Sequence, residues 1–205
     1  MDRTINELRN YVRCLLLTES AKTVSEIPDD VAVVITDVGD ELDFKIQFKT
    51  TAKTKWSNSN RLKNLGENLH ESGIFGVIVI KRISPKHGKC NDAMYVSWSQ
   101  AAKGWGPILY DIAIELATEL SGGLVADREH VSYHAQKIWA YYDSNRSDVT
   151  KVQLDNLEDS FKDGPFNDCT PAIDGLGFES PMGYMYSKEP TTINILKKQG
   201  KWFEE

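Results

Sequence analysis

The stretch "AAKGWGPILYDIAIELA", residues 101–117, places two glycines and a proline directly before an amphipathic run. Apolar residues recur behind this turn at spacings of three and four, which predicts a helix over 107–120. Its buried stripe consists of Ile108, Leu109, Ile112, Leu116 and Leu120. We expect Asp111, Glu115 and Glu119 on the same helix to face solvent.

The residues of the turn itself are suited to holding an anion. The first amides of a helix lack partners within the helix and lie at the positive end of its dipole. Gly104 and Gly106 would let a phosphate approach the backbone closely, and Lys103 adds a positive charge. Pro107 fits the first helical position but removes one N–H donor. The alternative is a plain strand-to-helix turn, and neither G-x-G-x-x-G nor G-K-[ST] is present to decide between the two.

The chain before the turn has the pattern of antiparallel strands. Residues 31–37 and 42–49 are separated by a short polar turn, and the second run alternates apolar and polar residues. Residues 73–83 and 93–100 are rich in β-branched and aromatic residues and predict a second hairpin. The other expected elements are a helix over 4–18, a short helix over 61–71, a buried strand over 122–128 and a helix over 131–142 with Ser132 as its N-cap.

This order of elements predicts an α/β (α+β) domain with a mixed, mostly antiparallel sheet flanked by helices. We assign residues 1–142 to that single domain. Residues 143–205 are rich in Asp, Gly, Pro and Ser and predict a loop-rich extension that packs on the domain or on a partner. Within it we expect mostly loop over 143–181 with a short helix at 149–157, then a strand near "MGYMYS" and a helix near 191–199.

Composition narrows the class of protein. The 205 residues are 40% hydrophobic and carry a formal net charge of -6, which argues against general nucleic-acid binding. The longest apolar runs, such as residues 75–80, are too short to span a bilayer, so we expect no membrane partner. Three widely spaced cysteines make a poor disulfide framework and favour a reducing compartment, so we expect a cytoplasmic protein.

Taken together, the second hairpin, the K-G-x-G turn, the amphipathic helix, the short strand and the aromatic-rich helix resemble the GNAT superfamily of acyl-CoA-dependent N-acyltransferases. The resemblance covers about residues 74–142. The family's turn has the form [Arg/Gln]-x-x-Gly-x-[Gly/Ala] and holds the pyrophosphate of the acyl-CoA, and the matching residues here are 101–106. The resemblance therefore implies a GNAT-like fold, acetyl-CoA as the donor substrate, and a pyrophosphate site at Lys103, Gly104, Trp105 and Gly106.

Two positions depart from the family pattern. Ala101 stands where the turn motif begins with Arg or Gln. The later helix of the family often reads Ala-x-x-x-Tyr, with the tyrosine protonating the departing thiolate, whereas Trp139 stands at that position here. An indole cannot act as such an acid. Of the neighbouring phenols, Tyr142 continues the apolar stripe of the helix and is expected in the core, which makes Tyr141 the candidate catalytic acid.

Other chemically capable residues carry weaker signals. His130 and His134 have a chelating spacing, but the sequence offers no obvious third ligand, so we predict no metal site. Asp127 follows a predicted strand, a position where carboxylates often meet ligands and also cap helices. The candidate bases on the predicted strands are Glu41, Asp43, Ser97 and Ser99, and the sequence does not choose among them.

The sequence leaves two functions open. The first is an N-acyltransferase that binds acetyl-CoA and acylates an amine. The second is a catalytically inactive GNAT-fold structural protein acting through protein contacts. The segment 127–142 is similar to GNAT-like domains encoded by bacteriophages, some of them in virion-associated proteins. In the second case we expect virion protein partners or a homo-oligomer, and a location in the host cytoplasm or the virion.

Overall fold

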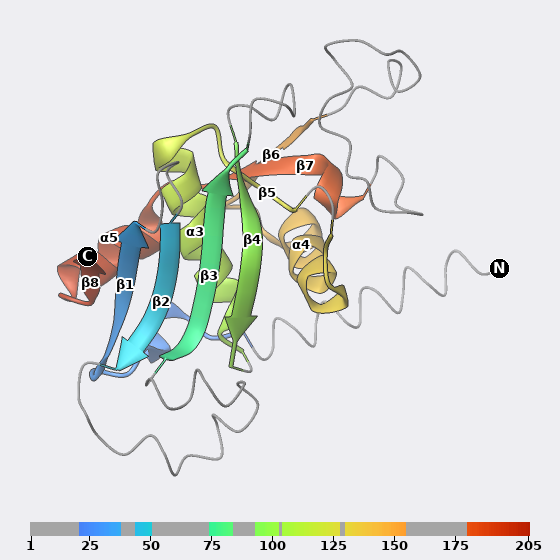
Figure 1. Cartoon of the computed structure of the whole chain (residues 1–205). Coiled ribbons are helices and arrows are strands. Elements are labelled where there is room, and N and C mark those ends of the chain that lie inside the picture. Colours follow the sequence, from blue (N-terminus) through green and yellow to red (C-terminus); the bar gives the residue numbers. More distant parts are fainter. Residues whose placement is uncertain are drawn as a thin grey trace, which may run out of the picture.

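Eight strands of the described chain join one sheet, in the order β6-β7-β5-β4-β3-β2-β1-β8 (Figure 1). The computed structural model describes residues 21–37, 44–50, 74–83, 93–102, 104–127, 130–154 and 180–205. The strands are β1 (Val31–Asp37), β2 (Phe44–Thr50), β3 (Ile74–Arg82), β4 (Met94–Ala101), β5 (Leu124–Val125), β6 (Thr150–Gln153), β7 (Tyr184–Ser187) and β8 (Trp202–Glu204). The helices are η1 (Val24–Glu26), α3 (Gly106–Leu120), α4 (Tyr133–Asn145), η4 (Pro181–Gly183) and α5 (Thr191–Lys198).

Most neighbouring strands run antiparallel, as the sequence predicts for a mixed sheet. Both predicted hairpins form, β1 with β2 and β3 with β4. Only two of the seven pairings are parallel, β4 with β5 and β1 with β8. The first of these follows from the chain order, because β4 and β5 are joined by helix α3 and a crossover helix returns the chain in the same direction.

Helix α3 covers one face of the sheet and forms the centre of the core (Figure 1). The predicted stripe is buried except at Leu120, the last residue of the helix, which is 37% exposed. The buried part packs on the inward side chains of β2 and β3, among them Ile46 and Phe48. The predicted alternation along β2 is correct for Phe48 and Lys49, but Gln47 is buried where solvent was expected. The reason is its place in the middle of the sheet, between Val34 of β1 and Val77 of β3, both also buried.

The described part of 143–205 is built into the same sheet. The helix predicted at 149–157 is wrong, because residues Thr150–Gln153 form strand β6. Pairing with β7 fixes this extended backbone, in a register of Thr150 against Ser187. The predicted strand near "MGYMYS" and the helix near 191–199 are confirmed as β7 and α5. The helices predicted over 4–18 and 61–71 lie outside the described residues.

Candidate functional site

Strand β5 is two residues long, and both of its residues pair with the beginning of β4. Met94 pairs with Leu124 and Tyr95 with Val125, and the described chain gives β4 no further partner on that side. On the other side, Val79 of β3 pairs with Trp98 while Ile80 pairs with Val96. Ser97 is therefore an extra residue in β4, a β-bulge that bends and twists the strand. The bulge lies just beyond the last β4 residue that pairs with β5, and the rest of this edge of β4 has no described strand beside it.

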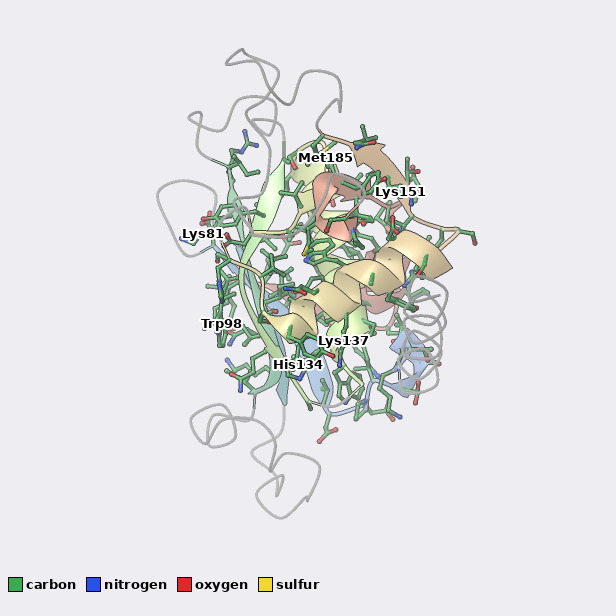
Figure 2. The ribbon with its side chains drawn as sticks, turned by 90° about the vertical axis from the view of Figure 1, so that its right-hand side faces the viewer. Lys81, Trp98, His134, Lys137, Lys151 and Met185 are labelled. Carbon is green, nitrogen blue, oxygen red and sulfur yellow. The ribbon has the colours of Figure 1, made fainter. Side chains whose placement is uncertain are left out.

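A cavity of about 240 Å³ lies beside this part of β4, between β4, α3 and the start of α4. Figure 2 looks onto α4, with Trp98 of β4 labelled beside it. The cavity is lined by Val96, Ser97, Trp98, Ser99, Tyr110, Asp127, His130, Val131, Ser132, Ala135 and Trp139. Its wall is thus an apolar and aromatic surface with a few hydroxyl groups, one carboxylate and one imidazole, which is the usual make-up of a small-molecule site.

Two hydroxyl groups in this wall touch each other. The Ser99 Oγ and Tyr110 Oη atoms are 3.1 Å apart. Tyr110 is buried, and burial raises the pKa of its phenol to about 12 although the contact with Ser99 lowers it slightly. The Tyr110 ring packs edge-on against Trp139 at 5.4 Å between centroids. The phenol is therefore held in place and keeps its proton at neutral pH.

The residues around the cavity owe their positions to local signals. Ser132 caps α4 as predicted, accepting a hydrogen bond at 3.3 Å from the N–H of Ala135. Asp127 turns the chain between β5 and α4, since its Oδ1 accepts from the N–H of His130 at 3.1 Å. This capped loop places the beginning of α4 opposite β4.

The glycine turn lies at the start of α3 and has structural reasons of its own. Gly104 has φ of 87°, a conformation that favours glycine, and its carbonyl accepts from the N–H of Lys22 at 2.9 Å. A Cβ at Gly106 would be 3.2 Å from Cδ1 of Ile138. Trp105 is half-buried and packs against Phe48, with ring centroids 5.6 Å apart. Lys103, the fourth predicted pyrophosphate contact, lies outside the described residues.

None of Gly104, Trp105 and Gly106 lines the cavity. They stand one helical turn before Tyr110, so the turn and the cavity are neighbours along α3 rather than one pocket. The role of these residues in binding pyrophosphate stays a prediction.

The two tyrosines at the end of α4 differ in their surroundings. Tyr142 is buried as predicted, and its hydroxyl donates to the carbonyl oxygen of Pro107 at 2.7 Å and to Asp111 Oδ1 at 3.0 Å. Tyr141 is half-buried, with its ring centroid 5.7 Å from the guanidinium carbon of Arg146. Neither ring lines the cavity, whereas Trp139 does. The assignment of Tyr141 as the catalytic acid stays a prediction.

The prediction that the acidic residues of α3 face solvent is wrong for Glu115, which is buried, and only half correct for Asp111, which is partly buried. Glu115 has no exposed surface, while Glu119 is exposed as expected. The physical reason is a partner distant in sequence: Glu115 forms an ion pair with Lys188 and accepts from the N–H groups of Thr192 and Ile193 at 2.9 and 2.7 Å. Glu115 thereby caps α5, which has no capping side chain of its own.

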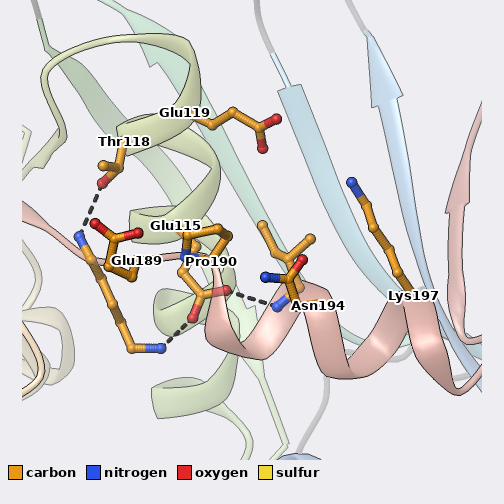
Figure 3. Close-up of a pocket in the computed structure, with 9 residues that line it drawn as sticks. Glu115, Thr118, Glu119, Glu189, Pro190, Asn194 and Lys197 are labelled. Atoms are coloured by element: carbon orange, nitrogen blue, oxygen red, sulfur yellow. Dashed lines mark hydrogen bonds and ion pairs between the residues drawn. The ribbon is translucent and has the colours of Figure 1, made fainter.

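A second cavity, of about 320 Å³, lies beside this ion pair between α3 and α5 (Figure 3). Glu119, Glu189 and Lys197 stand around it. The buried charges next to it are already engaged with each other, as the dashed contacts in Figure 3 show. This cavity is consequently a poorer candidate for chemistry than the one at β4.

Sequence reasoning noted Ser97, Ser99 and Asp127 but missed Tyr110. The missed signal is the shortness of the turn: only four residues separate β4 from α3. Such a turn brings the last residues of the strand against the first turn of the helix. Glu41 and Asp43, the other candidate bases, lie outside the described residues.

In the described residues, no helix is long and apolar enough to cross a membrane. Nor does that part of the chain gather three or more His, Cys, Asp or Glu side chains that could hold a metal ion. Compared with known protein families, with curated proteins and with solved structures, the chain has no significant match.

Proposed function

We propose that the chain is an N-acyltransferase that binds acetyl-CoA and transfers its acyl group to an amine. The observation that carries the proposal is the edge of β4 beyond its short parallel pairing with β5, which has no described strand beside it and borders a cavity of about 240 Å³. The resemblance of residues 74–142 to GNAT enzymes supports the same assignment, because in that family the strand before the glycine turn splays from its neighbour.

The proposed roles follow from the polar groups along the edge of β4 beside the cavity. From Val96 onward, one edge of β4 has no described strand beside it, and its peptide groups can pair with an extended ligand. The pantetheine arm of CoA contains two amides and would lie along this edge. A backbone N–H near the Ser97 bulge would stabilise the oxyanion as the amine attacks the thioester carbonyl. Holding the two reactants together would supply much of the rate.

The pyrophosphate would bind at the beginning of α3. Gly104 and Gly106 leave the backbone of the turn open to close approach, and the helix dipole favours an anion there. Lys103 would add its charge. The arm and the pyrophosphate would then occupy adjacent places along α3, consistent with a turn and a cavity that are neighbours but separate.

A second candidate function is a binding protein of the same fold that performs no transfer, such as the virion-associated component considered above. One observation favours it. Trp139, at the position of the family's acid, is buried and stacked on Tyr186 with ring centroids 5.2 Å apart, so it belongs to the core.

Calorimetric titration with acetyl-CoA tests the proposal on the wild type and on Gly104→Val. A valine at φ of 87° costs about 1–2 kcal/mol of strain and narrows the turn, so we expect at least a tenfold weaker affinity. The matched control is Gly200→Val, because Gly200 also has positive φ (66°) and a Cβ there has nothing within 4 Å. Gly200→Val should lose similar stability and keep wild-type affinity.

Absence of acetyl-CoA binding to the wild type at millimolar ligand would overturn the proposal. If binding occurs, thiol release from acetyl-CoA in the presence of an alkylamine, a polyamine and a lysine-containing peptide separates the two functions. Turnover with any of these amines supports the transferase. Tight binding with no thiol release supports the binding protein.

A further inference from the structure

The hydroxyl pair of Ser99 and Tyr110 joins β4 to α3 in the cavity wall. Ser99 comes from β4 after the bulge and Tyr110 from the second turn of α3. Both line the cavity, and their oxygen atoms are 3.1 Å apart. By contrast, the hydroxyls of Tyr142 and Tyr186 each donate to a backbone carbonyl at 2.7 Å.

Acyl transfer from a thioester produces a thiolate, which must be stabilised or protonated as it leaves. The other ionisable groups in the cavity wall are poorly suited to this. Asp127 would repel the thiolate when ionised, and His130 is exposed. The indole of Trp139 can donate a hydrogen bond but cannot give up its proton.

We infer that Tyr110 donates a hydrogen bond that stabilises the departing sulfur of the acyl donor and that Ser99 is its positioning residue. This inference rests on the proposed transferase function. It assigns the stabilising group to α3 and β4, whereas the sequence alone pointed to Tyr141 on α4.

In the transfer step the amine nitrogen bonds to the carbonyl carbon, the carbon–sulfur bond breaks, and the sulfur leaves as a thiolate that accepts a hydrogen bond from the Tyr110 hydroxyl. The Ser99 hydroxyl donates a hydrogen bond to the Tyr110 oxygen and so orients the phenol. The acylated nitrogen loses a proton to solvent and the thiolate takes one up from solvent, so the products are an amide and a free thiol.

The surroundings of Tyr110 keep its phenol in the protonated form that this role requires. Burial raises its pKa to about 12, so the hydroxyl carries its proton throughout the neutral range. The edge-on contact with Trp139 fixes the ring. Trp139 thus holds in place a hydrogen-bond donor that comes from a neighbouring helix.

The test measures the thiol pKa of bound CoA, which needs no knowledge of the acceptor amine. The probe is CoA itself, titrated through the thiolate absorbance of its complex against a complex with desulfo-CoA. A hydrogen bond from Tyr110 stabilises the thiolate, so Tyr110→Phe should raise the pKa of the bound thiol by about one to two units. Ser99→Ala should raise it by less, because the phenol remains.

Tyr142→Phe is the control. Like Tyr110→Phe it removes the hydroxyl of a buried tyrosine, but Tyr142 lies on α4 and does not line the cavity. It should lower the melting temperature and leave the bound thiol pKa at the wild-type value. Thermal unfolding and the CoA dissociation constant verify that Tyr110→Phe is folded. If that variant does not fold, Ser99→Ala carries the test.

Each outcome has a separate meaning. A thiol pKa that rises in Tyr110→Phe but not in Tyr142→Phe supports the inference. Binding of CoA with the same thiol pKa in the wild type, Tyr110→Phe and Ser99→Ala overturns the inference and leaves the transferase proposal intact. Failure of the wild type to bind either CoA or acetyl-CoA overturns the transferase proposal itself.

Discussion

The buried polar groups on the two sides of helix α3 differ in how many hydrogen bonds they make. Toward α5, the buried carboxylate of Glu115 accepts hydrogen bonds from Lys188, Thr191 and two backbone N–H groups. Toward β4, Tyr110 and Ser99 form one contact at 3.1 Å beside the cavity. A buried charge that loses its partner is strongly destabilising, so the first flank depends on the complete set of contacts to Glu115. The second keeps neutral hydroxyls and space, as a ligand site requires.

Asp111 belongs to the partnered side as well. Burial raises the pKa of its carboxyl, while Arg146 lowers it through an ion pair at 2.9 Å. Tyr142 donates to the same carboxyl at 3.0 Å. The network joins α3 to α4 and to the turn before β6. Two of the elements that line the cavity, α3 and α4, are therefore held together on the side away from it. Single substitutions on the two sides of α3 test this division, from the largest expected effect on the free energy of unfolding to the smallest.

Glu115→Ala should have the largest effect. It leaves Lys188, which is 5% exposed, without its ion-pair partner and removes the cap of α5. We expect a loss of about 3–5 kcal/mol in the free energy of unfolding, measured by urea denaturation. Glu119→Ala removes the same charge one helical turn later, at an exposed position, and should change stability by less than about 0.5 kcal/mol. Equal losses in the two variants would contradict the structural role of Glu115.

Tyr142→Phe should have an intermediate effect. It removes the hydroxyl that joins Pro107 to Asp111 and leaves both acceptors with one donor fewer. Because one of these hydrogen bonds is to a carboxylate, we expect a loss of about 2 kcal/mol in the free energy of unfolding. Tyr141→Phe is the comparison on the adjacent, half-buried residue and should lose less than about 0.5 kcal/mol. If both variants lose the same amount, the Tyr142 network does not join the helices.

Asp148→Asn should have a smaller effect that depends on pH. Hydrogen bonds from Arg146, at 2.7 and 2.6 Å, hold the pKa of the Asp148 carboxyl below its ordinary value. A lowered folded-state pKa stabilises the fold above the unfolded pKa of about 4, and this stabilisation is lost as the pH falls through the folded-state value. Asp148 is 51% exposed, so solvent screening limits the gain to at most about 1 kcal/mol.

The measurement is the difference in unfolding free energy between the wild type and Asp148→Asn at several pH values. It should be largest near pH 7 and should vanish toward about pH 2. The raised pKa of Asp111 acts in the opposite direction, stabilising the fold at acid pH, and is present in both proteins. A difference that grows on acidification would contradict the assignment.

Local patterns sufficed to predict the elements that frame the site. Alternation and β-branched composition predicted both hairpins, and the three-four spacing after Pro107 predicted α3. Ser132 was recognisable as a cap because that signal lies within three residues of its partner. The GNAT-specific part of the fold prediction goes beyond the mixed sheet and its helices, and it stays a prediction.

The features that could not be predicted depend on partners distant in the sequence. Glu115 is buried because of Lys188, 73 residues later, and a helical-wheel argument cannot include that partner. Strand β6 is extended because β7 pairs with it, over a separation of more than thirty residues. Tyr110 lies beside the buried stripe of α3, and only the packing of β4 against that helix brings it to Ser99.

Gly106→Ala should have the smallest effect on stability, and it tests directly whether a ligand approaches the turn before α3. Alanine favours a helix over glycine by at most about 1 kcal/mol, but its Cβ would stand 3.2 Å from Cδ1 of Ile138. These opposing terms should leave the free energy of unfolding within about 0.5 kcal/mol of the wild type.

The informative readout of Gly106→Ala is the acetyl-CoA affinity. If the pyrophosphate approaches this backbone, the added methyl group should weaken binding several-fold at nearly constant stability. Ile138→Val in the same chain would shorten the side chain that opposes the new Cβ and so restore the packing without restoring the affinity. Unchanged affinity in Gly106→Ala would mean that this glycine serves only the contact between α3 and α4. The anion, if one is bound, would then have to lie nearer Gly104.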